Sequence, residues 1–162
     1  MRHTIHTKSA AQTRALGRLL GGLMPAGAVI AASGGLGMGK TVFAQGLAQG
    51  LGIAGPVVSP TFTYIQEYAG RLPFCHVDAY RLEGWPEEDL AQIGLSDCFL
   101  NNKAAYVEWP ELIRPFLPAE TIELCFKAIP QQTEWRQLVF SYHADAHSWL
   151  PPLLQSGKLS TY

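Results

Sequence analysis

The sequence predicts an α/β fold of three layers, with helices on a mixed parallel and antiparallel central sheet. Two observations support this prediction. Residues 28–33 are an apolar run of strand length, and a glycine-rich turn and a run with apolar residues four apart follow directly, which gives the order strand, turn and helix. Further apolar or alternating runs of strand length recur along the chain, and some are close enough together to form hairpins.

Length and composition fit one compact domain over residues 1–162. With 48% hydrophobic and 15% charged residues, the chain has enough apolar material for a core and is not a disordered polar chain. A formal net charge of -1 argues against a protein that grips nucleic acid by itself. The N-terminus lacks an apolar signal core, and residues 23–36 are too short and too rich in glycine and proline to span a bilayer. We therefore expect a cytoplasmic protein with no membrane segment.

The elements before and around the turn have recognisable boundaries. Residues 4–9 form a polar lead-in with the character of an edge strand. Residues 10–23 carry leucines at three- and four-residue spacing, which predicts an amphipathic helix capped by Ser9. The strand at 28–33 leads through the turn into a helix over residues 42–51.

The second half of the chain is predicted to be mostly strands. A hairpin comes first, and a helix with acids in its first turn separates it from a strand that ends in an acid. A second hairpin and a short C-terminal helix follow. In order, the predicted segments are a strand in the second half of 57–68, a turn at 69–71, a strand at 72–77, a helix from 85 to 93, a short segment at 96–100, a strand at 104–110, strands at 121–127 and 135–142 joined by a loop at 130–134, and a helix broken by proline after 144.

The glycine-rich turn carries the strongest chemical signal. From Gly34 to Thr41 it fits the pattern glycine, four residues, Gly-Lys-Thr. Such a turn lets successive backbone N–H groups point at a phosphate, and the following helix adds the positive end of its dipole. Lys40 would reach the β- and γ-phosphates, and the Thr41 hydroxyl would bind Mg²⁺. The pattern between a strand and a helix predicts a P-loop NTPase-like fold.

Two acids follow strands downstream of this turn. Asp78 directly follows the strand at 72–77, and Glu108 lies near the end of the strand at 104–110. Ligands in this architecture gather at the carboxyl ends of strands, so both are candidates to organise Mg²⁺ or to orient the attacking water. The alternatives are a turn or cap residue for Asp78 and a surface acid for Glu108.

Other polar and aromatic residues leave more than one interpretation open. Ser59 and Thr61 flank a proline, and either ordinary turn chemistry or a functional role fits them. For His76 a structural role is favoured over a catalytic one. Trp109 fits either a core position or a place against the nucleotide, and spacing does not decide between them.

Three cysteines, Cys75, Cys98 and Cys125, complete the set of reactive side chains. Their number is odd, and no two of them have the spacing of metal ligands. Free cysteine is among the most buried residue types and behaves as a small hydrophobic residue. We therefore expect buried free thiols rather than a redox or metal site.

Several of these motifs together resemble the bacterial TsaE family of small P-loop ATPases. The phosphate loop alone is shared by many families, but four further motifs in this order and spacing are much more specific. The matching segments span nearly the whole chain and are Leu36–Thr41, Ser59–Thr63, His76–Arg81, Gly94–Phe99 and Val107–Pro110.

The resemblance implies roles for individual residues. Lys40, Asp78 and Glu108 would act in catalysis, and Thr41 and Glu108 would hold Mg²⁺. Ser59-Pro60-Thr61 is similar to a nucleotide-sensing switch segment. The residues implied to bind the nucleotide are Leu36, Gly37, Met38, Gly39, Lys40, Thr41, Val42, Thr61, Trp109, Thr13 and Arg136. The chain departs from the usual family pattern at Gly35, Val42 and Thr133, where an acid, a threonine and an arginine are more common.

The resemblance also implies a function: a Mg²⁺-dependent ATPase that serves synthesis of threonylcarbamoyladenosine at adenosine 37 of tRNA. Its partners would be the transferase TsaD and its partner TsaB, with tRNA contacted only indirectly through the complex. Two rival functions stay open: a small-molecule kinase, and a non-hydrolysing adaptor that senses nucleotide. A kinase usually has an arginine-rich lid, which the sequence lacks, and the only candidate acceptor-site feature is Tyr80-Arg81.

Overall fold

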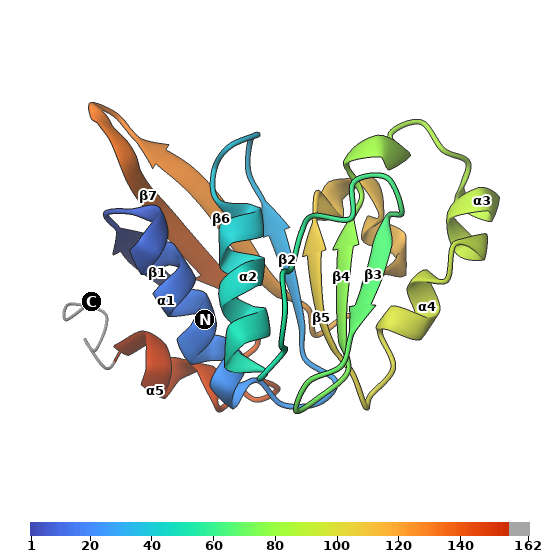
Figure 1. Cartoon of the computed structure of the whole chain (residues 1–162), viewed down its shortest axis with the longest axis horizontal. Helices are drawn as coiled ribbons and strands as arrows, with labels where there is room; N and C mark the ends of the chain where they lie inside the picture. The colour runs from blue at the N-terminus through green and yellow to red at the C-terminus, as the bar shows by residue number, and fades with distance from the viewer. Residues whose placement is uncertain (156–162) are drawn as a thin grey trace.

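The computed structural model describes residues 1–155 and contains one sheet with helices packed around it (Figure 1). The order of elements follows the sequence prediction closely. They are β1 (Arg2–Thr7), α1 (Ala10–Leu23), β2 (Val29–Ser33), α2 (Lys40–Gly50), β3 (Ile65–Tyr68), β4 (Phe74–Asp78), α3 (Glu87–Gln92), α4 (Leu95–Cys98), β5 (Ala104–Glu108), β6 (Ile122–Ile129), β7 (Gln132–Ser141) and α5 (Leu150–Gln155), with 3-10 turns η1 (Tyr80–Leu82), η2 (Pro110–Leu112) and η3 (Arg114–Phe116).

The sheet has seven strands in the order β1-β7-β6-β2-β5-β4-β3. The pairs β2–β5, β2–β6 and β4–β5 are parallel, and the pairs β1–β7, β6–β7 and β3–β4 are antiparallel. The predicted mixed sheet is therefore confirmed. Because β2 is central and parallel to both neighbours, its carboxyl end opens at the same edge as those of β5 and β6.

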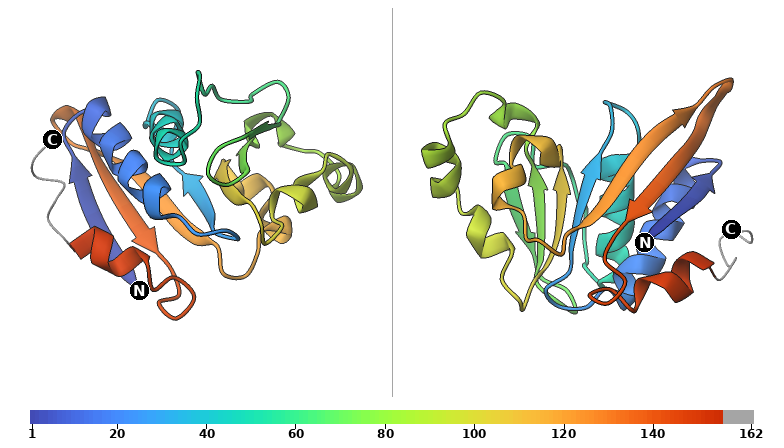
Figure 2. Two further views of the ribbon diagram at one scale, coloured as in Figure 1. Left: turned by 60° about the horizontal axis from the view of Figure 1, so that its bottom comes forward. Right: turned by 180° about the vertical axis from the view of Figure 1, so that it is seen from behind.

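Each face of the sheet has its own apolar core, which makes the fold three-layered. Helices α1, α2 and α5 cover one face, where Ile30 of β2 and Tyr106 of β5 are buried (Figure 2). Leu90 of α3, Leu95 of α4 and neighbouring residues of η1 pack with Val29 and other buried side chains in a second cluster. Since neighbouring residues of a strand point to opposite faces, β2 contributes to both cores.

Helices α1 and α2 approach so closely that glycine is required at their contact. A Cβ atom at Gly21 would lie 2.2 Å from the Leu47 carbonyl oxygen. One at Gly46 would lie 2.2 Å from the Arg14 carbonyl oxygen. The contact therefore joins the backbone of α1 to the backbone of α2.

Several boundaries differ from the sequence predictions; the first strand, for example, lies at Arg2–Thr7 instead of residues 4–9, and the strand predicted at 104–110 ends at Glu108. The predicted loop at 130–134 is shorter, because β7 already begins at Gln132. The strand predicted in the second half of 57–68 begins only at Ile65, since Tyr64 has a positive φ of 64° that ends the extended chain. The C-terminal helix is not broken by its prolines, which lie in the first turn of α5, where no backbone N–H is needed. The part of the predicted tail beyond residue 155 lies outside the described residues. No helix among residues 1–155 is long and apolar enough to cross a membrane.

Candidate functional site

The turn between β2 and α2 has the backbone shape expected of a phosphate-binding loop. Gly34 has φ +133°, and a Cβ there would lie 2.7 Å from the Phe126 carbonyl oxygen. Gly39, which precedes α2, has φ +98°, a conformation that side chains rarely adopt. The positive φ angles, and at Gly34 also the close carbonyl oxygen, explain why glycine occurs at these two positions. The loop ends at the amino terminus of an 11-residue helix, where backbone N–H groups and the helix dipole favour an anion.

Lys40 lies folded back over this loop. Its Nζ donates to the carbonyl oxygens of Gly34 at 2.5 Å and Gly35 at 2.8 Å, and lies 4.2 Å from the centre of the Trp109 ring. Desolvation by burial lowers the pKa of Lys40, opposed by the negative charges of Glu108 and Asp78. The ammonium group is therefore held by carbonyls and an aromatic face, which are weaker partners for a cation than phosphate oxygens are.

The first residues of α2 meet the end of β5. The Thr41 hydroxyl lies 3.1 and 3.2 Å from the two carboxylate oxygens of Glu108, to which it donates. Glu108 is 3% exposed and pairs in register with Ala32 near the end of β2. The buried Tyr106 hydroxyl donates to the Lys40 carbonyl oxygen at 2.9 Å and fixes the start of α2 against β5.

Asp78, at the end of β4, organises the segment that precedes β3. Ser59 donates to Asp78 Oδ2, and the Thr61 hydroxyl lies 3.2 Å from the same oxygen. The backbone N–H of Tyr80 donates to Asp78 Oδ1 at 3.0 Å. Asp78 therefore has the turn role considered as an alternative, since its side chain accepts from the backbone two residues on, and it also ties Ser59 and Thr61 to the site. Asp78 pairs in register with Glu108, so the two acids lie side by side.

Two cavities meet at the loop. One of about 390 Å³ is lined by Lys40, Thr41, Asp78, Glu108 and Trp109, among others. The other, of about 410 Å³, lies toward α1 and the β6–β7 hairpin. Both are lined by residues 37–39 and by residue 42 of the turn and helix. A ligand that spans both cavities would cross the glycine loop, which suits a phosphate chain with a group at each end.

Thr13 and Arg136 lie at the second cavity. The Thr13 hydroxyl is bonded to Thr7 Oγ1 at 2.7 Å and to the Ser9 carbonyl oxygen at 3.2 Å. A Cβ at Gly39 would lie 3.8 Å from the Thr13 methyl group, so Thr13 presents its methyl to the loop. Arg136 Nη2 lies 3.4 Å from the carbonyl oxygen of residue 37. A contact of these two residues with a nucleotide stays a prediction.

Trp109 forms one wall of the first cavity. It has a positive φ of 59°, which turns the chain directly after β5. Its ring lies 5.0 Å from the ring of Tyr80 and beneath the Lys40 ammonium. Trp109 is partly buried against the second core, so both interpretations left open by the sequence describe part of its position.

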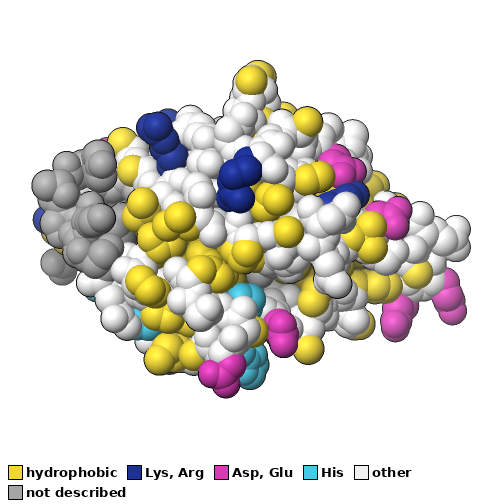
Figure 3. Space-filling view, turned by 90° about the horizontal axis from the view of Figure 1, so that it is seen from below, with side chains coloured by type: hydrophobic (Ala, Val, Ile, Leu, Met, Phe, Trp, Pro, Cys, Tyr) yellow, Lys and Arg dark blue, Asp and Glu magenta, His cyan; other side chains and the backbone are white. Residues whose placement is uncertain are grey.

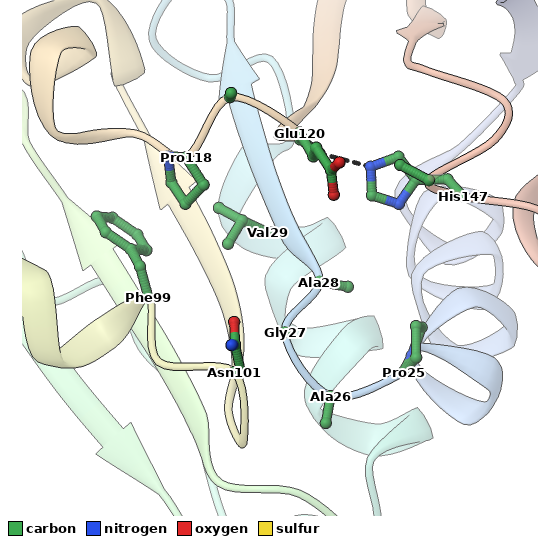
Figure 4. A pocket seen from close by; sticks show the side chains of 12 residues that line it. Pro25, Ala26, Gly27, Ala28, Val29, Phe99, Asn101, Pro118, Glu120 and His147 are labelled. Carbon is green, nitrogen blue, oxygen red and sulfur yellow. Dashed lines mark hydrogen bonds between the residues drawn. The ribbon is translucent and has the colours of Figure 1, made fainter.

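A third cavity, of about 500 Å³, lies away from the loop, at the amino end of β2. Residues 25–29, Asn101 and Pro118 line it, with the Glu120 side chain and the His147 ring at one side (Figure 4). The His147 ring is bonded to the Glu120 backbone carbonyl. Figure 3 shows the molecule from below relative to Figure 1, and on this face hydrophobic side chains are mixed with histidine and acidic ones. Although this cavity is larger, it has neither the glycine loop nor the helix terminus of the site.

Magnesium and nucleotide fit the donors that are present. No three His, Cys, Asp or Glu side chains in residues 1–155 are grouped to hold a metal ion by themselves. The Thr41 hydroxyl and the Glu108 carboxylate are hard oxygen donors, which Mg²⁺ prefers. Since Mg²⁺ is usually bound by one or two protein oxygens together with substrate phosphates, two donors at a phosphate-binding loop are a suitable set.

The structure brings most of the predicted residues together and adds His76 to them. Lys40, Thr41, Asp78, Glu108, Thr61 and Trp109 line one cavity, together with Ser59. His76, for which the sequence favoured a structural role, lies with Nε2 2.9 Å from Glu108 Oε1. A polar residue inside an apolar strand is the signal that points to it. Outside the site, the buried thiols of Cys75 and Cys98 lie 2.8 Å apart, a proximity that sequence spacing did not indicate.

A glycine loop that joins a central parallel strand to a helix, with strand-end acids facing the helix terminus, defines a P-loop NTPase-like α/β protein. A family model described as "Threonylcarbamoyl adenosine biosynthesis protein TsaE" matches residues 7–138. This chain belongs to the TsaE family, and the resemblance inferred from the motifs is confirmed.

Individual relatives agree with the family model. The chain is 37% identical over 123 residues to the tRNA threonylcarbamoyladenosine biosynthesis protein TsaE of Treponema pallidum, a match that covers 76% of this chain and 90% of the relative. It is 40% identical over 122 residues to the protein of the same name from Bacillus subtilis, with 75% of each chain covered. The crystal structure of Bacillus subtilis YdiB superposes with a TM-score of 0.80 at 30% identity, over 98% of this chain and 97% of that one.

Proposed function

We propose that this protein binds ATP with Mg²⁺ and hydrolyses it as a subunit of the complex that makes N6-threonylcarbamoyladenosine at adenosine 37 of tRNA. In that complex it supports turnover of the TsaD–TsaB transferase, in the cytoplasm, and meets tRNA only through its partners. The observation that carries the ATPase part is the pairing of Thr41 with Glu108 at the amino end of α2. Family membership supports the pathway.

The residues of this site have separate tasks in the proposed reaction, in which water attacks the γ-phosphoryl group to give ADP and phosphate. The backbone N–H groups of the loop and of the start of α2 bind phosphate oxygens. Lys40 exchanges its two carbonyl partners for phosphate. Thr41 and Glu108 would hold Mg²⁺, which would supply positive charge beside the phosphates, and Glu108 would also orient the attacking water. Asp78 keeps the Ser59–Thr61 segment against the cavity, so this segment can respond to the nucleotide.

Slow hydrolysis by the isolated protein is part of the proposal. Among the residues that line the cavity of Thr41 and Glu108, Lys40 is the only cation. The nearby Arg81 guanidinium lies 4.3 Å over the Phe62 ring instead. An arginine that stabilises the charge of the transition state is worth roughly 10³–10⁵-fold in phosphoryl transfer. A site without one is expected to turn over slowly until a partner completes it.

The first experiment measures ATP hydrolysis by the purified protein, alone and with TsaD and TsaB. Stimulation by the partners, lost in Lys40→Ala, is the expected result, because Lys40 is placed to bind phosphate and removing it leaves the fold's strands untouched. Equal turnover with and without partners would contradict the proposal, as would full stimulation of the Lys40→Ala variant.

The same preparation separates the two rival functions. A small-molecule kinase would consume ATP only when a metabolite acceptor is added, and the acceptor would gain the phosphate. A non-hydrolysing adaptor would release no phosphate in any condition, so Glu108→Ala would have no activity to remove. The proposal expects phosphate release that needs no metabolite acceptor and that falls in Glu108→Ala.

A further inference from the structure

Among the described residues, His76 is the one fully buried histidine next to the site, and the proposed reaction assigns it no task. It lies in β4 with 0% exposure. Its ring is flanked by Phe74, with ring centres 6.3 Å apart, and by Tyr106, at 5.7 Å. Its Nε2 lies 2.9 Å from Glu108 Oε1, whereas its Nδ1 is buried without a hydrogen-bond partner. One end of the ring is therefore bonded to an acid of the site, and the other faces apolar surroundings.

These surroundings select one tautomer of the ring. A carboxylate oxygen accepts hydrogen bonds, so Nε2 must carry the hydrogen and donate it. A hydrogen on Nδ1 would be buried without an acceptor, which is costly. The arrangement therefore places a hydrogen on Nε2, and the bond to Glu108 fixes the ring orientation.

The bond to His76 divides the two carboxylate oxygens of Glu108 between different tasks. Oε1 accepts a hydrogen bond from His76 Nε2. Within the described residues, Oε2 accepts a hydrogen bond only from the Thr41 hydroxyl, at 3.2 Å. The Thr41 hydroxyl is shared almost equally between both oxygens, so by itself it does not fix the rotation of the carboxylate. The hydrogen bond from His76 holds Oε1 in place and leaves Oε2 available to a ligand in the cavity.

We infer that His76 is a positioning residue, which orients the Glu108 carboxylate for its role toward Mg²⁺ and water through a hydrogen bond from Nε2. This inference rests on the proposed function of Glu108. Residues that orient a metal-binding carboxylate typically change metal affinity or activity by about 10- to 100-fold when they are replaced. His76 acts through Glu108 and does not contact the reacting atoms.

A matched pair of amide variants tests the inference. In His76→Gln the amide nitrogen falls near the position of Nε2, so it can still donate to Glu108. In His76→Asn the amide ends near the position of Nδ1 and cannot reach Glu108. Both replace the ring with a buried amide, so a difference between them reports the bond to Glu108 rather than the loss of the ring. Unfolding midpoints of both variants provide the stability control.

The expected result is a separation of kcat from KM. At saturating Mg²⁺, His76→Asn should lose about 10- to 100-fold in kcat with KM for ATP nearly unchanged, and should need more Mg²⁺ for half-maximal activity. His76→Gln should recover most of the activity and the wild-type Mg²⁺ midpoint. Equal loss in both variants, or wild-type values in both, would overturn the inference.

Two readouts do not depend on turnover. If the wild-type protein hydrolyses no ATP, the proposed function fails, but the Mg²⁺ midpoint for binding a fluorescent ATP analogue still distinguishes the two variants. If neither variant folds, nitrogen NMR of the wild-type imidazole still tests the hydrogen bond. Hydrogen on Nε2 of His76 is expected, and an Nε2 without hydrogen would refute the proposed bond.

Discussion

The close contact of α1 with α2 predicts that Gly46→Ala destabilises the protein, although alanine favours helices. Replacing glycine by alanine in a helix interior normally stabilises by about 1 kcal/mol. Here the new Cβ would lie 2.2 Å from the Arg14 carbonyl oxygen, 2.9 Å from the Arg18 nitrogen and 3.0 Å from the Arg14 carbonyl carbon. All three are backbone atoms of the neighbouring helix, so no side-chain rotation relieves the clash.

The magnitude follows from these two opposed effects. The contact must open from 2.2 Å to the 3.4 Å of an ordinary van der Waals contact, so the helices must separate by more than an ångström. Overpacking of this kind costs about 1–3 kcal/mol, and a rigid backbone contact belongs at the upper end. After the helix-propensity gain, a net loss of about 2 kcal/mol remains, which lowers Tm by roughly 4–8 °C in a chain of this size.

Urea unfolding of Gly46→Ala beside Gly22→Ala measures the effect. Gly22 is an exposed helical glycine of α1 whose added Cβ would meet nothing closer than 3.9 Å. This control should be neutral or stabilised by up to about 1 kcal/mol. A Gly46→Ala protein as stable as the control would refute the conclusion that backbone contact requires glycine there.

Three further outcomes are expected. Glu108→Gln keeps the side-chain size but loses the negative charge, so partner-stimulated hydrolysis should fall about 10²–10⁴-fold while binding of a fluorescent ATP analogue persists. Arg71→Met removes two hydrogen bonds, of 3.0 and 2.8 Å, to carbonyls at the end of α1, and should cost about 1 kcal/mol of unfolding free energy in a urea titration, because the arginine is exposed. In alkylation of the native protein followed by mass spectrometry, Cys125 should react before Cys75 and Cys98, which are buried; equal rates would contradict that burial.

Much of the site could be predicted from the sequence, because the carboxyl ends of parallel strands lie at the same edge of the sheet. Once the glycine turn identifies the central strand, an acid at the end of another strand in the same sheet is expected near it. Asp78 and Glu108 follow that logic and lie beside the loop. The start of α1 was also predictable, since Ser9 caps this helix through its hydroxyl as expected.

Features that depend on register between distant strands could not be predicted. His76 contacts Glu108 because β4 and β5 align His76 with Tyr106, two residues before Glu108 on the same face. Sequence alone gives neither the neighbouring strand nor that alignment. The meeting of Cys75 in β4 with Cys98 in α4 has the same origin, since it depends on how α4 packs against the sheet.

The pairing of β1 with β7 has a consequence for synthesis of the chain. Arg2 lies opposite Ser141, and Thr7 opposite Arg136, so the first strand has its sheet partner at the far end of the described chain. At a translation rate of roughly 5–20 residues per second, about 7–28 s pass between the synthesis of Arg2 and that of Ser141. Throughout that interval β1 has no strand partner and is available to chaperones or to incorrect pairing with other strands. The seven-stranded sheet can be completed only when translation of the described residues is nearly finished.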